Sequence, residues 1–228
     1  MSSAGPASAV PKDCRGEESV ILGAGKTRIA RQPTGKRIGL LGGSFNPAHR
    51  GHRMISEIAA EHLALDEVWW LVSPQNPLKP EAGMAELSER VRTAQTMAKG
   101  ASIRVTDIEK DLKTHFTADT LAGLKDLYPW HRFVWLMGAD NLIQISRWRH
   151  WSSIFHTVPV AVFARPSYSF RAESAKAARR FARYRVKPYA AKRLADMRPP
   201  AWVFLKIRLD PTSATELRSR AAEAGAAG

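Results

Sequence analysis

The chain has 228 residues, of which 44% are hydrophobic and 25% charged, a composition that predicts an ordinary globular core. A single cysteine, Cys14, excludes an internal disulfide framework and favours a reducing compartment. The net charge of +14 favours an anionic ligand such as a nucleotide, a phosphate or a nucleic acid. No apolar run approaches the roughly 18 residues of a membrane span, and the N-terminus lacks the apolar core of a secretion signal. We therefore expect a soluble, cytoplasmic protein.

The first 35 residues differ in composition from the rest of the chain. They are rich in Gly, Ser, Ala and Pro and show no sustained hydrophobic period, which is typical of a flexible segment. The run GAGKT at 23–27 resembles the end of a P-loop, but that motif requires a glycine where this chain has Val20. We expect a flexible leader over residues 1–35 and a single domain over residues 36–224.

Beyond residue 36, short apolar runs alternate with amphipathic segments. Strands are predicted at 37–42, 67–73, 102–107, 132–138, 158–164 and 202–207, and helices at 52–63, 87–100, 117–128, 139–145, 151–155, within 173–198 and at 213–225. Ser88 is the expected N-cap of the second helix and Gly100 its end. Repeated strand–helix units predict an α/β fold with a Rossmann-like, doubly wound, mostly parallel sheet and helices on both faces. In such folds ligands bind beyond the carboxyl ends of the strands, so residues that directly follow strands are the functional candidates.

The stretch GGSFNPAHRGH, residues 42–52, follows the first predicted strand. Gly42 and Gly43 let backbone amides approach a phosphate without an intervening Cβ, and the N-terminus of the next helix favours an anion. His49 and His52, three residues apart, can face the same way and donate hydrogen bonds to phosphate oxygens. A metal site is the alternative, but no cysteine or paired carboxylate nearby completes one. Because the segment is too polar and too rich in turn residues for buried histidines, we predict a cradle for a triphosphate.

This stretch resembles the (T/S)-F-(D/N)-P-x-H-x-G-H signature of the nucleotidyltransferases that share a catalytic domain with class I aminoacyl-tRNA synthetases. The resemblance implies that His49 and His52 contact the ATP phosphates and stabilise the pentacovalent transition state. It also assigns four loop residues to ATP binding: Gly42, Gly43, Ser44 and Phe45.

A second informative stretch is GADNLIQISRWRHW, residues 138–151. From the residues alone, Asp140 is either a helix N-cap or a carboxylate that accepts hydrogen bonds from ribose hydroxyls. Trp148 is either a core residue, with Trp151 three residues on, or a flat face on which an aromatic ring stacks. The residues themselves leave both alternatives open.

Together with HFTADTL at 115–121 and ARP at 164–166, this stretch resembles the bacterial nicotinate-nucleotide adenylyltransferases over most of residues 37–220. The resemblance implies that Asp140 meets a ribose and that Trp148 stacks on the nicotinate ring. The residues it assigns to nicotinate mononucleotide are Thr117, Asp140, Trp148 and Arg165.

The stretch DPTSATELR, residues 210–218, resembles the C-terminal signature I-S-S-T-x-I-R of the same family. Ser213 and Thr215 would lie at a helix N-terminus, where amides and hydroxyls hold phosphate, and Arg218 would fork onto the β- or γ-phosphate. The alternative is a helix N-cap followed by a surface arginine. Ala214 replaces the middle serine of the signature, which removes one hydroxyl contact.

The implied reaction joins ATP and nicotinate mononucleotide into nicotinate adenine dinucleotide and releases pyrophosphate, without a covalent enzyme intermediate. The substrate phosphate is already a nucleophile, so the protein positions the reactants and stabilises charge. The expected catalytic residues are His49, His52, Arg218 and Lys79, although the histidine that often precedes this lysine in the family is absent. Mg²⁺ is the expected cofactor, held mainly by the ATP phosphates and not by a protein metal site.

Residues 173–198 carry nine Lys or Arg against Glu173 and Asp196. We expect a solvated helix face there, because no stacking aromatic residues interleave with the charges; a nucleic-acid patch on an inactive relic of the fold is the alternative. The expected partners are ATP and nicotinate mononucleotide, without a membrane or a nucleic acid, and a homo-oligomer is left open.

Sibling enzymes are the nearest alternatives. Pantetheine-phosphate adenylyltransferase typically lacks the first histidine of the pair, which is present here as His49, and the R-T-E-G-I-S-T-T pattern of two cytidylyltransferases is absent. A nicotinamide-mononucleotide adenylyltransferase is the other sibling, and the sequence does not fix the preference between nicotinate and nicotinamide.

Overall fold

The structure is a computed structural model that describes residues 35–74, 83–164 and 168–206. Its strands are β1 (Arg37–Gly43), β2 (Glu67–Val72), β3 (Ile103–Thr106), β4 (Arg132–Gly138), β5 (Val160–Phe163), β6 (Arg185–Val186) and β7 (Trp202–Leu205). Its α-helices are α1 (Arg50–Leu63), α2 (Leu87–Ala98), α3 (Ile108–Asp111), α4 (Thr117–Leu127), α5 (Ala139–Gln144), α6 (Trp151–Thr157), α7 (Ser169–Glu173) and α8 (Lys176–Arg180). The described residues also include three 3₁₀ helices, η2 (Ile145–Arg147), η3 (Ala182–Tyr184) and η4 (Pro188–Asp196).

Two predictions lie outside the described residues, namely the leader with its boundary at residue 35 and the last helix at 213–225. Both therefore stay predictions. None of the helices in the described ranges is both long and apolar enough to cross a lipid bilayer.

The strands form one sheet in the order β3-β2-β1-β4-β5-β7-β6, and every neighbouring pair is parallel. The predicted α/β fold with a Rossmann-like, doubly wound sheet is therefore confirmed. The order of strands reverses between β1 and β4, which makes the crevice beyond their carboxyl ends the expected ligand site. Residues 42–52 continue from β1, and Asp140 follows β4, so both stretches singled out in the sequence lie at this reversal.

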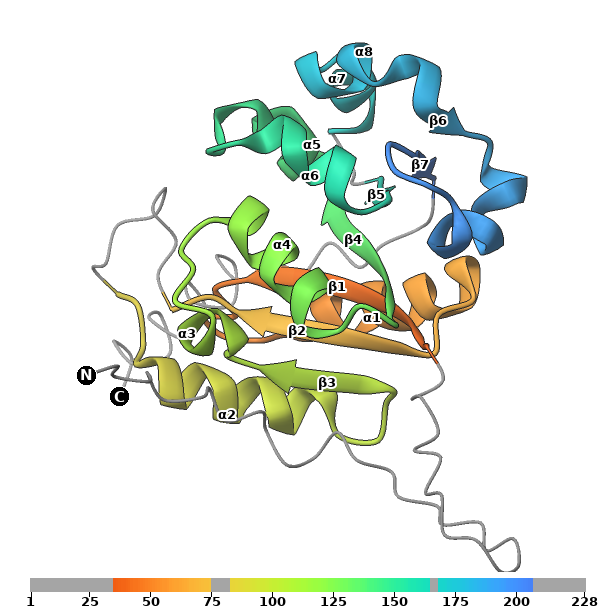
Figure 1. Ribbon diagram of the computed structural model, residues 1–228. Coiled ribbons are helices and arrows are strands. Elements are labelled where there is room, and N and C mark those ends of the chain that lie inside the picture. Colours follow the sequence, from red (N-terminus) through yellow and green to blue (C-terminus); the bar gives the residue numbers. More distant parts are fainter. Residues whose placement is uncertain (1–34, 75–82, 165–167, 207–228) are drawn as a thin grey trace, which may run out of the picture. The chain divides into compact units, whose positions relative to one another are not determined.

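Helices cover both faces of the sheet, as Figure 1 shows for α1 and α4. Successive strand residues point to opposite faces. On one face, strand residues such as Leu41 and Leu136 join a buried cluster with Ile55 and Leu63 of α1. On the other face, Trp69 of β2 meets Tyr128, just beyond α4, edge to face with 5.3 Å between ring centroids. Burial on both faces explains why the strands read as nearly continuous apolar runs.

The basic segment departs from the prediction, because the expected single helix within 173–198 is broken into short pieces. Arg185 and Val186 form β6, which pairs with β7 at the edge of the sheet. Pro188 then begins η4, a position that suits its missing N–H, and it disfavours the helical conformation in Lys187 before it. Phe181 is buried and stacks on Phe155 of α6, 4.3 Å between centroids, which fixes the segment by tertiary packing.

The start of α2 also differs from the prediction. The helix begins at Leu87 with Glu86 at the N-cap, and no side chain caps it, so the N-cap role expected of Ser88 is wrong. Its end agrees with the prediction, because Gly100, with a φ of +78°, follows directly after the C-cap residue Lys99.

Candidate active site

The two histidines of the 42–52 stretch hold the first turn of α1 together. His49 is the N-cap, and its Nδ1 accepts a hydrogen bond from the Gly51 amide at 3.2 Å. His52 Nδ1 accepts from the His49 amide, also at 3.2 Å, and the two ring centroids lie 3.8 Å apart. A ring nitrogen that accepts from an amide carries no proton, so each neutral imidazole has its proton on Nε2. The structure thus brings the two predicted histidines together as Nε2–H donors.

His49 is more deeply packed than the polarity of the stretch suggests. The expectation that the segment excludes a buried histidine is wrong, because the His49 side chain is only 4% exposed. An aromatic floor explains this: Phe45 stacks on Trp70 of β2 with 5.0 Å between centroids and meets the His52 ring at 4.7 Å. Phe45 takes a left-handed φ of 46°, which turns the loop back over the sheet.

Ser56 links this floor to the histidine turn. Its fully buried hydroxyl donates to the His52 carbonyl at 2.8 Å and accepts from the Trp70 indole N–H at 2.8 Å. The donor and the acceptor are both satisfied without water, so α1 is fixed in rotation against β2. Sequence reasoning missed Ser56, because a serine inside an amphipathic helix gives no signal of its partners.

The two glycines that end β1 differ in their surroundings. A Cβ on Gly42 would lie 2.5 Å from Cη2 of the buried Trp135 ring, so the glycine is required for packing. A Cβ on Gly43 would meet the Phe45 ring at 3.4 Å, an ordinary contact. Packing therefore explains Gly42, while Gly43 stays the candidate for close approach to a phosphate.

The segment that leads into α2 is tied to the same loop. Asn46 Nδ2 donates to the Gly83 carbonyl at 3.0 Å, and Asn46 Oδ1 accepts from the Ala85 amide at 3.3 Å. Arg90 of α2 reaches back and donates to the Ser44 carbonyl at 2.7 Å. Sequence reasoning did not assign a role to either side chain. The signal for Arg90 was its place on the buried face of α2, four residues before Ala94.

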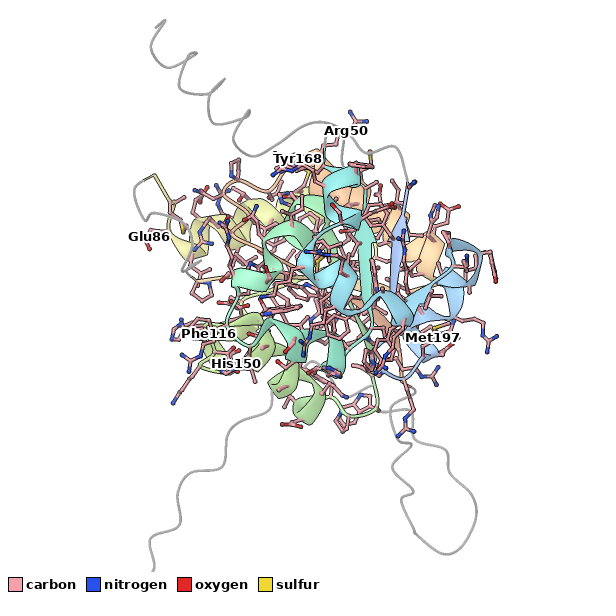
Figure 2. The ribbon with its side chains drawn as sticks, turned by 90° about the horizontal axis from the view of Figure 1, so that it is seen from above. Arg50, Glu86, Phe116, His150, Tyr168 and Met197 are labelled. Atoms are coloured by element: carbon pink, nitrogen blue, oxygen red, sulfur yellow. The ribbon has the colours of Figure 1, made fainter. Side chains whose placement is uncertain are left out.

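The candidate residues for the pyridine nucleotide lie on neighbouring segments. Thr117 is the first residue of α4, and the N-cap Phe116 lies under the Arg149 guanidinium, 4.9 Å from the ring centroid. Trp148 directly precedes Arg149 and is partly exposed. Figure 2 shows Phe116 and His150 next to each other, in agreement with this contact. The structure therefore brings the neighbourhoods of Thr117 and Trp148 together.

The tryptophan pair of this stretch has divided roles. Trp151 packs edge to face against Phe155 and Phe181, at centroid distances of 6.5 and 6.1 Å. Within the described ranges no aromatic ring is placed against Trp148. Packing accounts for Trp151, whereas stacking of a ligand ring on the partly exposed Trp148 stays a prediction.

Asp140 lies in the first turn of α5, whose N-cap is Gly138. The interpretation of Asp140 as an N-cap is therefore wrong. Its side chain lines a pocket of about 390 Å³ along α5, together with Arg147, Tyr168 and Arg171 among others. The two histidines are not among the residues that line this pocket.

Glu109 of α3 is a buried carboxyl group that sequence reasoning missed. It is 8% exposed, and Thr120 Oγ1 donates to its Oε1 at 3.5 Å. Burial raises the pKa of Glu109, and this effect outweighs the hydrogen bonds from Ser73 and Thr120 and the charge of His115, which lower it. Ser73 follows β2, and its amide donates to the Gly43 carbonyl at 2.9 Å, so Glu109 is linked to the end of β1.

Five predicted site residues lie outside the described ranges: Lys79, Arg165, Ser213, Thr215 and Arg218. Their convergence on the histidines stays a prediction. In the described part of the chain, no group of three His, Cys, Asp or Glu side chains could hold a metal ion.

Several cations of the basic segment make structural contacts. Arg180 lies over the Trp151 ring at 5.8 Å from its centroid. Arg185 lies over Trp202 at 5.3 Å and pairs with Glu173 at 3.0 Å. These contacts account for two of the nine cations, and the choice between a solvated face and a nucleic-acid patch stays a prediction.

Comparison with known proteins adds independent findings. A family model described as "Cytidylyltransferase-like" matches residues 40–220. A Bradyrhizobium sp. (strain ORS 278) protein named "probable nicotinate-nucleotide adenylyltransferase" is 50% identical over 183 residues, which is 80% of this chain and 95% of that one. A protein of the same name from Parvibaculum lavamentivorans is 47% identical over 186 residues, 82% of this chain and 92% of that one.

The fold is also similar to solved structures. Plasmodium falciparum nicotinic acid mononucleotide adenylyltransferase complexed with NaAD superimposes with a TM-score of 0.59 and 19% identity, covering 81% of this chain and 83% of that one. The same enzyme complexed with APC gives a TM-score of 0.59 at 18% identity. At this identity the likeness concerns the fold.

Proposed function

We propose that this chain transfers the adenylyl group of ATP to nicotinate mononucleotide, because it belongs to the cytidylyltransferase-like family and, within that family, to the nicotinate-nucleotide adenylyltransferases. The products are nicotinate adenine dinucleotide and pyrophosphate, a step of NAD biosynthesis. The observation that carries the proposal is the reciprocal cap of His49 and His52 at the start of α1, beyond the strand where the sheet reverses its order. Helix amides and two imidazole N–H groups together favour a polyphosphate there.

The reaction needs no nucleophile from the protein. An oxygen of the mononucleotide phosphate attacks the α-phosphorus of ATP in line and forms a new P–O bond. The bond between the α-phosphorus and the oxygen that bridges it to the β-phosphorus breaks. Pyrophosphate leaves with the electron pair. Charge grows on the phosphate oxygens in the transition state, and donors fixed in advance stabilise it at no cost in reorganisation. The Nε2–H groups of His49 and His52 supply such donors, because their Nδ1 atoms are already engaged by backbone amides.

The pyridine nucleotide is proposed to lie along α4 and the 148–150 segment. Trp148 offers a partly exposed face for stacking on the nicotinate ring, and Thr117 lies at the N-terminus of α4, where an anionic group is favoured. Asp140, in the first turn of α5 just beyond β4, is proposed to accept hydrogen bonds from a ribose. Arg165 belongs to the same proposal, although it lies outside the described residues.

The triphosphate is proposed to be held also by Lys79, Ser213, Thr215 and Arg218, which lie outside the described residues. A divalent cation is proposed to arrive with ATP as its Mg²⁺ complex. Mg²⁺ prefers hard oxygen ligands, and the triphosphate itself supplies them. The phosphate oxygens of the substrate then supply most of the coordination.

The experiment is a pyrophosphate-release assay of the purified full chain with MgATP and three separate acceptors, together with a control that contains no acceptor. We expect turnover with nicotinate mononucleotide, less with nicotinamide mononucleotide, and none with phosphopantetheine or with the acceptor left out. Replacing MgATP by MgCTP should abolish turnover. Preferential use of phosphopantetheine, or no turnover with any acceptor, would contradict the proposed function.

A further inference from the structure

The guanidinium group of Arg90 is buried beneath the 42–52 loop, and its partners are backbone carbonyls. The side chain is 2% exposed. Nη1 donates to the Ser44 carbonyl at 2.7 Å and to the Ser73 carbonyl at 2.8 Å. Nη2 donates to the Pro74 carbonyl at 2.9 Å, and Nε to the Ala85 carbonyl at 2.9 Å. One side chain thus joins the phosphate loop, the end of β2 and the start of α2.

Among the residues that the structure describes, no ion pair balances the charge of this guanidinium. No carboxylate oxygen in the described part of the chain lies within the 4.0 Å of an ion pair to Arg90, whereas exposed Arg92 on the same helix pairs with Glu89 at 2.8 Å. Burial lowers the pKa of Arg90, and the more distant charge of Glu86 opposes this. Figure 2 labels Glu86 at the outer end of α2. A buried cation without a direct counter-charge is costly, so its retention needs a reason.

We propose that Arg90 is a positioning residue for the triphosphate, with its positive charge held against the Ser44 carbonyl so that the bound polyphosphate becomes its counter-charge. The inference rests on the proposed function, because ATP is the polyanion at this loop. By thermodynamic linkage, the free energy by which the polyanion stabilises the buried cation equals the free energy by which the cation tightens binding of the polyanion. Four carbonyl contacts also fix the position of the loop before ATP arrives.

The alternative is a structural clip, meaning that Arg90 holds the loop in place only through these hydrogen bonds and that its charge has no role in ATP binding. Arg90→Lys keeps the charge but loses the planar fork, and Arg90→Gln keeps an amide donor but loses the charge. Arg92→Lys and Arg92→Gln are the matched controls, because they make the same changes on an exposed turn of the same helix. The two pairs together separate charge from geometry.

The measurements are the affinity for MgATP by calorimetry and the KM values for both substrates from pyrophosphate release. We expect Arg90→Gln to weaken MgATP binding by about 10- to 100-fold, the range for a lost interaction with a charged group. Arg90→Lys should recover about half of that loss on a logarithmic scale, since the charge persists on a compact ammonium group that lacks the planar fork of hydrogen-bond donors. The KM for nicotinate mononucleotide should change much less, and both Arg92 variants should bind MgATP as the unchanged protein does.

Equal losses in Arg90→Lys and Arg90→Gln would overturn the proposal and leave a structural clip. MgATP binding in Arg90→Gln that matches Arg92→Gln would overturn it as well. If Arg90→Gln does not fold, Arg90→Lys decides: MgATP binding weakened by more than about tenfold would contradict the role of charge. If the unchanged protein binds MgATP but forms no dinucleotide, the proposed function fails and the Arg90 comparison is still read from binding.

Discussion

His52 Nδ1 accepts a hydrogen bond from the backbone amide of His49 at 3.2 Å. The residue expected to bind phosphate therefore also caps the N-terminus of its own helix, α1. His52→Ala should lower kcat by about 10²–10³, the loss seen when one transition-state donor is removed. It should also cost about 1 kcal/mol of folding free energy through the lost cap. Pyrophosphate release and urea denaturation measure the two effects separately.

His52→Gln is the matched control for that variant. Glutamine at the third helical position can accept the N-cap amide in a capping box, so most of the folding free energy should return. Turnover should stay well below that of the unchanged protein, because an amide cannot reproduce the imidazole Nε2–H geometry. Near-normal turnover in His52→Ala would remove this histidine from the catalytic set.

Gly42 and Gly43 should respond differently to the same added methyl group. Gly42→Ala pushes a Cβ to 2.5 Å from the buried Trp135 ring and should destabilise the fold by about 1–3 kcal/mol. Gly43→Ala makes only an ordinary contact with Phe45, so stability should change by about 0.5 kcal/mol or less. Its KM for ATP should rise if the Gly43 backbone approaches phosphate. Equal stability of the two variants would contradict the packing role of Gly42.

Ala64 offers a stabilising change at the end of α1. It is the C-cap, with a left-handed φ of 51° and ψ of 50°, a conformation that glycine adopts without strain. Ala64→Gly should therefore raise the free energy of unfolding by about 0.5–1 kcal/mol. Ala60→Gly, inside the same helix, should lower it by about 1 kcal/mol. Urea denaturation of both variants tests the contrast, which would fail if the two changes had the same sign.

The sequence was sufficient to predict the α/β class, and the reason is physical. Strands buried on both faces, such as Glu67–Val72 and Val160–Phe163, read as apolar runs, and helices with one buried face read with a helical period. The histidine pair was also predictable, because its spacing is a local property of one loop. The basic segment was not, since the packing of Phe181 on Phe155 and the pairing of Val186 with β7 depend on distant residues.

The residues that support the candidate site could not be predicted for the same reason. The Arg90 guanidinium meets the carbonyl of Ser44, 46 residues earlier in the chain. Ser56 is paired with Trp70, 14 residues on, by a contact that exists only after α1 packs on the sheet. Hydrophobic periodicity indicates which face of an element is buried, but it does not indicate which hydrogen-bond partner a polar side chain on that face will meet.

Glu109 should make the stability of the fold depend on pH. Burial raises its pKa above the ordinary glutamate value of 4.5, so the ionised form costs folding free energy at neutral pH. The cost is fully present above the folded-state pKa and disappears as the pH falls through that pKa to the ordinary value. Glu109→Gln should therefore raise the free energy of unfolding at pH 7.5 and give little or no gain near pH 4.5. Denaturation by urea at both pH values checks this.

Glu61→Gln on the exposed face of α1 is the control and should change stability by about 0.5 kcal/mol or less at either pH. A gain for Glu109→Gln that is the same at both pH values would show that ionisation of this carboxyl group is not its cause.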